Sequence, residues 1–343
     1  MRNQNKYPQV SVIVPCYNEE RTIHLLLAAL LRQTYPIARM DVVISDALST
    51  DKTREKISEF QTKHPDLKIR VVDNNARTIP AGVNSAARTA RGQILVRLDA
   101  HSEPNPEYVA VSVALLSEGV ADNVGGIWHI QPGADTHIAR AIALAAGHPL
   151  GVGDAKYRVS NKAQYVDTVP FGAFYREKFF DIGAFDESLL ANEDYEFNAR
   201  LQQDGGKVYL DPRIISRYHA RPNLRRLAIQ YWRYGFWKVK MLARFPDTIR
   251  LRQAVPPLFA SSLILFSFLA IFLPFARIIL LGELVLYFSA LFAAGLASAM
   301  KKRQLECFLM PAAMLVMHLS WGFGFIFSLL HSFIKENNKR HEK

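Results

Sequence analysis

Cysteine is nearly absent from this chain of 343 residues, which contains only Cys16 and Cys307. The two lie in different parts of the sequence without a cysteine neighbour, so a disulfide framework and a cysteine zinc site are both excluded. The first twenty residues also lack a long apolar stretch and a small-residue cleavage site, so no secretory signal is expected. These absences indicate a domain that faces a reducing cytoplasm.

Acidic residues are outnumbered, because 31 Asp and Glu oppose 42 Lys and Arg, giving a net charge of +11. This charge is compatible with nucleic-acid binding, but much of it is concentrated in residues 217–253, among several Tyr and Trp rings. Such a segment is typical of a helix on an anionic membrane surface, with Trp232 and Trp237 at headgroup depth. The alternative is a solvated basic helix packed on the domain. Nucleic acid is not an expected partner.

Charged residues are scarce in residues 254–330. Three stretches there, 256–276, 278–299 and 308–330, each approach the ~20 apolar residues that a bilayer-spanning helix needs. The sequence therefore predicts a multi-pass protein of the plasma membrane. Three full spans would leave the basic tail outside, against the positive-inside tendency. A re-entrant or interfacial stretch around Pro274–Arg277 would instead return the tail to the cytoplasm.

The first hundred residues alternate between short, β-branched apolar runs and segments with helical spacing. The strand-like runs cover residues 10–18, 40–46, 67–75 and 93–101. Strand–helix alternation with short connections predicts an α/β fold with a doubly wound, mainly parallel sheet. Ligands of such sheets bind beyond the carboxyl ends of the strands.

Both common nucleotide-binding signatures are missing. The chain has no G-x-x-x-x-G-K-[ST] loop, and no G-x-G-x-x-G follows its first strand. Three of the predicted strands nevertheless end in aspartate, at Asp46, Asp73 and Asp99. Carboxylates repel phosphate unless a divalent cation bridges them. The pattern predicts a nucleotide or metal-phosphate site without a P-loop.

Five segments resemble, in order and spacing, the motifs of family 2 glycosyltransferases. They are VSVIVPCYNEE, VVISDALSTDKT, AGVNSAARTARGQILVRLDAH, FGAFYREKFFDIGAFDESLLANEDYEFNARLQQDG and QYWRYG, within about residues 8–240. The nearest likeness is to membrane-bound bacterial exopolysaccharide transferases of the succinoglycan glucosyltransferase type. The resemblance implies a GT-A fold, inverting transfer from a nucleoside-diphosphate sugar, and use of Mg²⁺ or Mn²⁺.

The resemblance assigns donor binding to the ends of the strands. Asp46 matches the acidic turn that contacts the base, although Ser45 stands where the commonest form has a second aspartate. Asp73 is expected beside the nucleoside, and Arg77 within reach of phosphate. The loop after the first strand is expected to border the nucleotide through Pro15, Tyr17, Asn18 and Glu19.

Asp99 and His101 match the family's D-x-D motif, with histidine as the second ligand. The resemblance therefore implies that Asp99 coordinates a diphosphate-bound cation and that His101 is a metal ligand or a diphosphate contact. Mn²⁺ accepts an imidazole nitrogen more readily than Mg²⁺ does. The alternative is a turn in which Asp99 and Ser102 cap the next helix.

Glu193 and Asp194, in NEDYEFNARL, match the family's E-D motif. Asp194 is expected to act as the base that deprotonates the acceptor hydroxyl, and Glu193 to contact the acceptor or support the base. The alternative is that both acids only cap a helix, whose N-terminus favours negative charge.

The segment 230–235 resembles the Q-x-x-R-W motif found at the membrane surface. Gln230, Trp232, Arg233 and Tyr234 are expected to contact the acceptor sugar or the membrane, although Tyr234 replaces the usual tryptophan. Plain interfacial anchoring by the rings is the alternative. His219 is a weaker candidate for a phosphate contact.

Together these features predict a cytoplasmic-face transferase that adds a sugar, from a UDP-sugar, to a lipid-linked oligosaccharide in bacterial exopolysaccharide synthesis. A processive synthase and a non-catalytic membrane subunit with a GT-A-like domain are the alternatives. Membrane lipids are expected partners, with other polysaccharide-assembly proteins as further candidates. The predicted parts are a GT-A domain (1–222), a basic interfacial segment (223–253), a membrane region of about three helices (254–331) and a charged tail (332–343).

Overall fold

The computed structural model describes residues 7–341, without the side chains of residues 247 and 335–341. Of the predicted charged tail, residues 342–343 and the side chains from 335 onward thus lie outside the described part. The chain forms two units. Unit 1 comprises the residues up to 129 and residues 160–218, and unit 2 comprises residues 130–159 and those from 219 onward.

One mixed sheet forms the centre of unit 1. Four neighbouring strands are parallel, in the order β3 (Lys68–Asp73), β2 (Met40–Asp46), β1 (Val10–Cys16) and β4 (Ile94–Arg97). Their apolar runs are buried on both faces of the sheet in β1, β2 and β4, as parallel strands usually are. The sheet continues through β8 (Ala173–Tyr175), β6 (Asn123–Gln131), β9 (Val208–His219) and β5 (Glu103–Pro104), and β7 (Gln164–Tyr165) pairs with β9.

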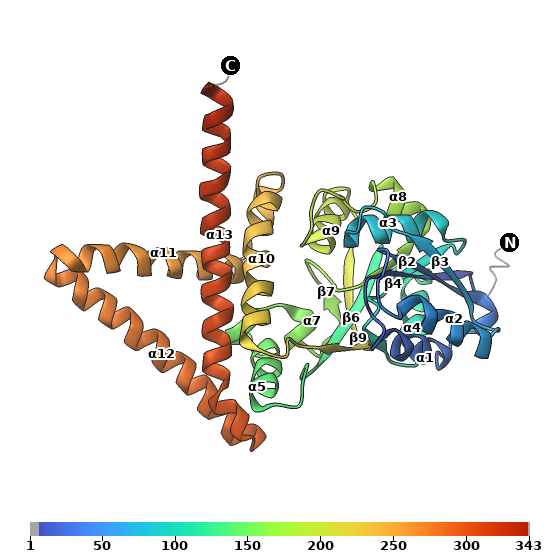
Figure 1. Ribbon diagram of the computed structural model, residues 1–343, viewed down its shortest axis with the longest axis horizontal. Helices are drawn as coiled ribbons and strands as arrows, with labels where there is room; N and C mark the ends of the chain where they lie inside the picture. Colours follow the sequence, from blue (N-terminus) through green and yellow to red (C-terminus); the bar gives the residue numbers. More distant parts are fainter. Residues whose placement is uncertain (1–6, 342–343) are drawn as a thin grey trace. The chain divides into compact units, whose positions relative to one another are not determined.

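Helices cover both faces of this sheet (Figure 1). One face carries α1 (Ile23–Leu31), α2 (Thr53–Lys63) and α4 (Tyr108–Ser117), and the other carries α3 (Ile79–Thr89), α8 (Arg176–Asp181) and α9 (Glu193–Gln203). Each layer has its own apolar core. A short 3₁₀ turn, η1 (Ile37–Arg39), precedes β2. The predicted α/β architecture is confirmed.

Strand register aligns the ends of the parallel strands. Cys16 lies opposite Asp46 in the β1–β2 pair, and Asp46 lies opposite Asp73 in the β2–β3 pair. The pairing continues one step further, because the backbone N–H of Asn74 donates to the carbonyl of Asp46 over 2.8 Å. The strand-end acids therefore gather at one edge of the sheet, where ligands of doubly wound sheets bind.

Unit 2 is helical. Its first segment follows β6 and forms α5 (His137–Ala146), α6 (Pro149–Val152) and α7 (Lys156–Val159). Its second segment follows β9 and forms α10 (Leu224–Leu242), α11 (Leu251–Phe272), α12 (Pro274–Lys302) and α13 (Met310–His341), with 3₁₀ turns η2 (Pro246–Thr248) and η3 (Leu305–Phe308).

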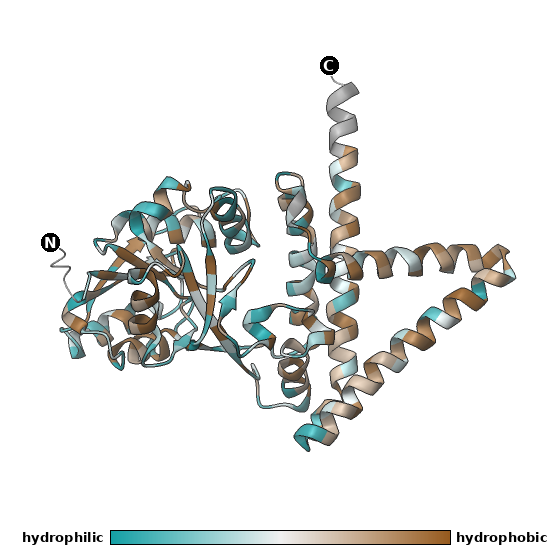
Figure 2. Ribbon diagram, turned by 180° about the vertical axis from the view of Figure 1, so that it is seen from behind, coloured by the Kyte–Doolittle hydropathy of each residue, from teal (hydrophilic) through white to brown (hydrophobic). Residues whose placement is uncertain are grey.

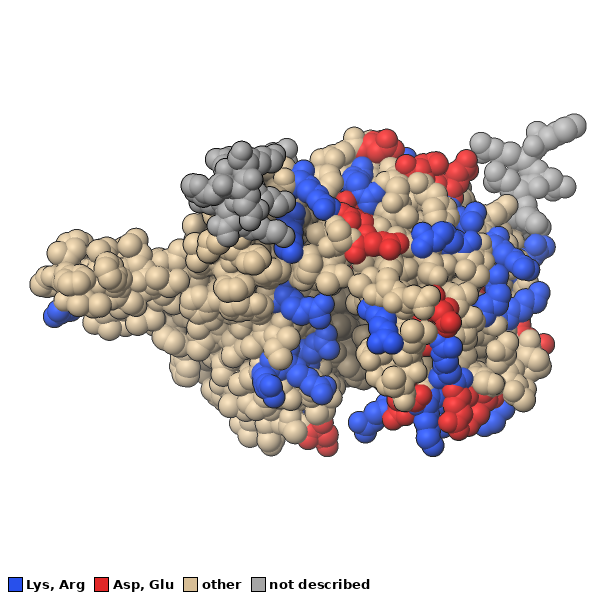
Figure 3. All heavy atoms as spheres, turned by 45° about the horizontal axis from the view of Figure 1, so that its top comes forward, with Lys and Arg blue, Asp and Glu red and all other residues tan. Residues whose placement is uncertain are grey.

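By length and composition, α11, α12 and α13 could each cross a membrane. Figure 2 shows α11 and α12 hydrophobic along most of their length, and Figure 3 shows almost no charged side chain on that part of unit 2. α11 and α12 meet at Leu273. Pro274 has no N–H to continue the hydrogen bonds of α11, and it begins α12 instead. The three predicted apolar stretches are thus three long helices.

Candidate functional site

The loop after β1 is tied to the loop after β2. Asn18 has a positive φ of 52°, and its side-chain oxygen accepts a hydrogen bond from the N–H of Thr50 over 2.9 Å. The Asn18 N–H in turn donates to the Ser49 hydroxyl over 2.9 Å. These bonds fix the segment that holds Pro15 and leave the Tyr17 ring half exposed, where it can stack on a planar group.

Arg54, in the first turn of α2, joins two strand-end acids. Its guanidinium contacts Asp46 over 2.6 Å and Asp73 over 2.5 Å. Hydrogen bonds to Asp73 and Asp46 raise the pKa of Arg54. Asp46 is fully buried and also accepts from the N–H and hydroxyl of Ser49, over 3.1 and 2.5 Å. Asp73 is the more open acid, with its side chain 56% exposed.

Arg77 lies in the turn between β3 and α3, also with a positive φ, and is exposed. Its N–H donates to the carbonyl of Asn74 over 3.1 Å, which closes the turn. The backbone conformation places Arg77 just beyond the acid-bearing edge of the sheet.

The Asp99 turn is not a helix cap. The N–H and hydroxyl of Ser102 donate to the backbone carbonyl of Asp99, over 2.9 and 2.7 Å, and the next helix begins only at Tyr108, after Glu107. The Asp99 carboxylate is therefore available for another role and is 24% exposed.

His101 is held by the loop after β1. Its Nδ1 lies 2.9 Å from a carboxylate oxygen of Glu19. Burial alone would raise the pKa of Glu19, but hydrogen bonds from His101 and Thr22 and the charge of His101 lower it overall. Glu19 therefore contributes to the site by orienting an imidazole.

Arg97 connects Asp99 to the Glu193–Asp194 pair. It is the last residue of β4 and only 3% exposed. One terminal nitrogen lies 3.4 Å from Asp99 and 3.2 Å from Glu193, and the other contacts Asp194. A buried arginine is stable only when paired. Three acids from two separate segments thus share one buried cation.

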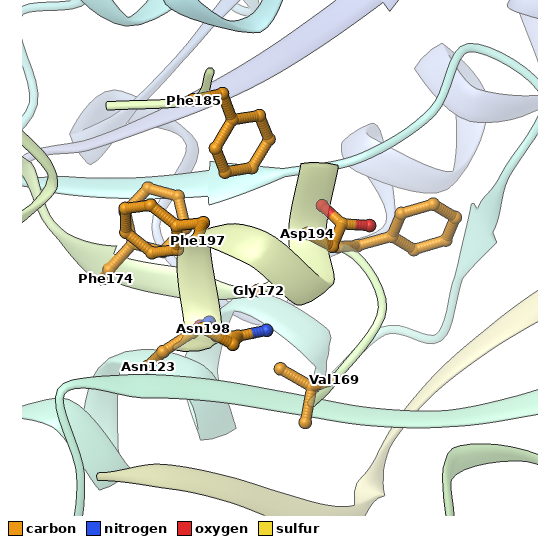
Figure 4. Close-up of a pocket in the computed structure, with 9 residues that line it drawn as sticks. Asn123, Val169, Gly172, Phe174, Phe185, Asp194, Phe197 and Asn198 are labelled. Carbon is orange, nitrogen blue, oxygen red and sulfur yellow. Dashed lines mark hydrogen bonds between the residues drawn. The ribbon is translucent and has the colours of Figure 1, made fainter. Parts of the chain in front are cut away.

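Aromatic rings position α9, which carries two of these acids. Phe174, Phe179, Phe185 and Phe197 pack with centroid distances from 4.9 to 5.6 Å. Figure 4 shows Asp194 at the start of α9, beside a small pocket that Asn123 and Asn198 also line.

The contacts do not favour the alternative in which Glu193 and Asp194 only cap a helix. The residue before α9, Asn192, has a positive φ of 65° and makes no side-chain cap. Both acids lie in the first turn, where the helix dipole favours them, but their closest ionic partner is Arg97. Their carboxylates are thus directed to the site rather than to the helix end.

The predicted surface motif lies in unit 2, on α10. Gln230 donates to the Tyr234 hydroxyl over 3.0 Å, the Trp232 ring packs on Phe327 of α13 with centroids 5.6 Å apart, and Arg233 is exposed. His219 ends β9. The Trp232 ring thus serves packing between helices.

Sequence reasoning missed Arg54 and Arg97. For Arg97 a signal existed, because a charged residue inside the buried run ILVRLD requires a buried partner. Among the side chains that the structure describes, no group of three or more His, Cys, Asp or Glu residues is arranged to hold a metal ion.

Three comparisons with known proteins bear on this site. The profile of Glycosyl transferase family 2 matches residues 11–183. The succinoglycan biosynthesis protein ExoA of Rhizobium meliloti is 29% identical over 321 residues, covering 93% of this chain and 94% of ExoA. A dolichyl N-acetyl-α-D-glucosaminyl phosphate 3-β-D-2,3-diacetamido-2,3-dideoxy-β-D-glucuronosyltransferase of Methanococcus voltae is 26% identical over 329 residues, covering 94% of this chain and 97% of that protein.

The fold has a similar solved structure. The mannosyltransferase PcManGT from Pyrobaculum calidifontis, in complex with GDP-Man and Mn²⁺, superposes with a TM-score of 0.60 at 21% identity, covering 92% of this chain and 88% of that one. This likeness confirms the GT-A-like architecture expected from the sequence. With the family profile matching half of its length, the chain belongs to glycosyl transferase family 2.

Proposed function

We propose that this glycosyltransferase transfers a sugar, with inversion, from a nucleoside-diphosphate sugar to a lipid-linked acceptor at the cytoplasmic face of the plasma membrane. The observation that carries the proposal is Arg97, which brings the acid at the donor edge, Asp99, together with the base candidate Asp194. The relative from M. voltae is named for a dolichyl phosphate acceptor and ExoA for succinoglycan synthesis. We infer a bacterial exopolysaccharide acceptor from the latter, and we propose a UDP-sugar as the donor.

In the proposed reaction, Asp194 removes the proton of the acceptor hydroxyl as its oxygen attacks the anomeric carbon. The new C–O bond forms on the face opposite the nucleoside diphosphate, whose bond to the sugar breaks, so the configuration inverts. Asp194 suits this role because its side chain is 30% exposed and Arg97 holds its carboxylate. Glu193 is more deeply buried and supports the same guanidinium.

The donor nucleotide would lie along the strand ends. The Tyr17 ring would stack on the base, while Asp73 and Arg54 would contact the nucleoside. Asp46, being fully buried, would shape this pocket through Ser49 and Arg54. Beyond these, Pro15 and Asn18 shape the loop, and Arg77 would reach the phosphates.

Asp99 and His101 fit a divalent cation. The Glu19 carboxylate orients His101 through Nδ1, as carboxylates commonly do for metal-binding histidines. Mg²⁺ sites use one or two carboxylates together with substrate phosphates, so a larger cluster of protein ligands is not required. A cation held by Asp99 and His101 would neutralise the charge of the leaving diphosphate.

The acceptor would approach from the membrane. α10 exposes Arg233, which is suited to anionic headgroups, and Gln230 and Tyr234 are candidate contacts for the acceptor sugar. We propose that Trp232 contributes to acceptor binding indirectly, by packing α10 against α13.

The test uses salt-washed membranes, a panel of UDP-sugars and GDP-mannose, and extracted lipid acceptor. Asp194→Asn should reduce transfer by about 10³-fold, within the range for loss of a general base, while donor binding is retained. Asp204→Asn is the matched control, because Asp204 lies at the other end of α9 and pairs with Lys178 on the surface. Substantial turnover by Asp194→Asn would contradict the assignment.

Product analysis separates the alternatives. Addition of a single sugar supports the proposal, and a ladder of products would indicate a processive synthase. Donor binding without transfer of any donor in the panel would favour the non-catalytic subunit.

A further inference from the structure

α10 lies directly against α13, and this contact restricts where α13 can lie. A Cβ added at Gly235 would lie 2.1 Å from the carbonyl oxygen of Trp321, and one at Gly324 would lie 2.4 Å from that of Trp232. The two backbones therefore touch, and the Trp232–Phe327 ring pair closes the same contact. Figure 1 shows the two helices side by side.

The contact falls in the middle of the apolar stretch of α13, which covers Met310–Ile334. At the same level α10 exposes Arg233, which lies between the contact residues Trp232 and Gly235. α10 has no acidic residue and also exposes Arg225, Arg226 and Lys240. If α13 crossed the bilayer, Arg233 would enter the hydrocarbon, where charged side chains are strongly disfavoured.

The beginning of α13 and the turn before it are held by the segment 130–159 of unit 2. The His318 imidazole lies 2.9 Å from the carbonyl oxygen of Leu150 in α6. Glu306, in η3, contacts Arg140 over 3.0 Å and His137 over 3.2 Å, both in α5. The segment 130–159 connects two strands of the sheet, and none of its helices is long enough to cross a bilayer. It therefore stays on the face of the membrane where unit 1 lies.

α11 and α12 are less covered by the rest of unit 2 than α13 is, because 11% of the apolar window of each is buried, against 33% for α13. Large apolar side chains are exposed along both helices, including Leu258 at 67%, Ile278 at 73% and Leu286 at 74%. At their junction, the Arg277 guanidinium donates to the carbonyl of Ala270 over 2.7 Å and so satisfies the end of α11. Glu283 of α12 accepts a hydrogen bond from the Ser262 hydroxyl of α11. A mostly apolar hairpin with its backbone groups paired suits the acyl chains of a bilayer.

We propose that the α11–α12 hairpin is the part of the chain that inserts into the bilayer, and that it returns the chain to the face from which it entered. α13 then lies with α10 at the membrane surface, on the face of unit 1, and the C-terminus lies on that face as well. This arrangement differs from the sequence expectation, which placed the non-spanning stretch around Pro274–Arg277. It agrees with the basic residues of KENNKRHEK, since cytoplasmic segments are rich in Lys and Arg.

The experiment compares inside-out and right-side-out membrane vesicles that contain the full chain. Cys16→Ala and Cys307→Ala provide a cysteine-free background for His331→Cys, on exposed α13, or Lys63→Cys, on exposed α2. A membrane-impermeant maleimide should label both from the same face. Labelling of His331→Cys from the opposite face, or from neither face, would overturn the proposal.

A second measurement does not depend on these substitutions. A protease-cleavable tag is placed at the C-terminus of the otherwise unchanged chain, and a second protein carries the tag at the N-terminus. Added protease should remove both tags in inside-out vesicles and neither tag in right-side-out vesicles. Removal of only the C-terminal tag in right-side-out vesicles would show an odd number of crossings and overturn the proposal. Neither result depends on the transfer reaction.

Discussion

Two arginines organise the acids at the strand ends, and they differ in burial. The Arg54 side chain is 45% exposed and binds Asp46 and Asp73, whereas that of Arg97 is 3% exposed and binds Asp99 and the α9 acids. Solvent can replace Asp73, the exposed partner of Arg54, because exposed ion pairs contribute little to stability. Water cannot replace Arg97, because removing one member of a buried pair leaves uncompensated charge. The first arrangement suits a ligand that enters and leaves, and the second suits fixed catalytic geometry.

Among the substitutions that test this comparison, Arg97→Met is expected to have the largest effect on activity and stability. Asp194 and Asp99 would lose their common cation, and a shift of about 1 Å in a reacting group can cost about 10²-fold in rate. We expect kcat to fall by at least that factor, with a smaller change in the donor KM, and the stability of unit 1 to fall by about 3 kcal/mol. Steady-state kinetics and thermal unfolding of purified protein measure both.

Arg97→Lys separates positioning from bulk stability. Lysine keeps the charge but lacks the planar fork that reaches three carboxylates. It should restore most of the thermal stability and only part of kcat. A kcat at the wild-type value in Arg97→Met would remove the distinction between the two arginines.

An intermediate effect is expected from Glu19→Gln. The amide would hold His101 less firmly and without charge, and loss of such a supporting group typically weakens metal binding by about 10–100-fold. The Mn²⁺ concentration that gives half-maximal transfer should rise accordingly, with little change in kcat at saturating Mn²⁺. Glu20→Gln is the control, because the Glu20 side chain accepts instead from the N–H of Lys52. Equal metal dependence in both variants would contradict a role for Glu19 in orienting His101.

The parallel half of the sheet could be predicted because its signals are local. Apolar runs such as VSVIV and VVIS are buried on both faces, and each is followed by a helix-like segment. In the antiparallel half, the long strands β6 and β9 cover most of the predicted strands GGIWHIQP and KVYLD, but β5, which has two residues, and β8, which has three, could not be predicted. Such strands carry no measurable periodicity and depend on the partners that pair with them.

The candidate site, too, could be predicted only in part from the sequence. Asp99, His101 and the Glu193–Asp194 pair are recognised through family motifs, and the structure brings their segments together through residues outside those predictions. Arg54 reaches its acids from α2, a contact that no sequence spacing encodes. The apolar composition of α13 predicts a membrane span. Our proposal that α13 lies at the surface rests instead on the arginine-bearing helix beside it, which composition does not reveal.

The smallest effect is expected from Arg54→Gln, which tests the exposed half of the comparison. Glutamine keeps hydrogen-bonding capacity without charge. The lost pair with Asp73 is half-exposed, whereas Asp46 is buried and keeps its hydrogen bonds from Ser49. The free energy of unfolding should fall by about 1–2 kcal/mol, less than in Arg97→Met, because only one of the two acids is buried. The donor KM should rise several-fold while kcat stays near the wild-type value, because an interaction made equally in the ground and transition states affects KM. Higher ionic strength should weaken donor binding in the wild type, since exposed charges are screened. The difference in donor KM between the wild type and the variant should therefore become smaller. A large loss of kcat in Arg54→Gln would instead show that Arg54, like Arg97, helps to hold the catalytic groups in place.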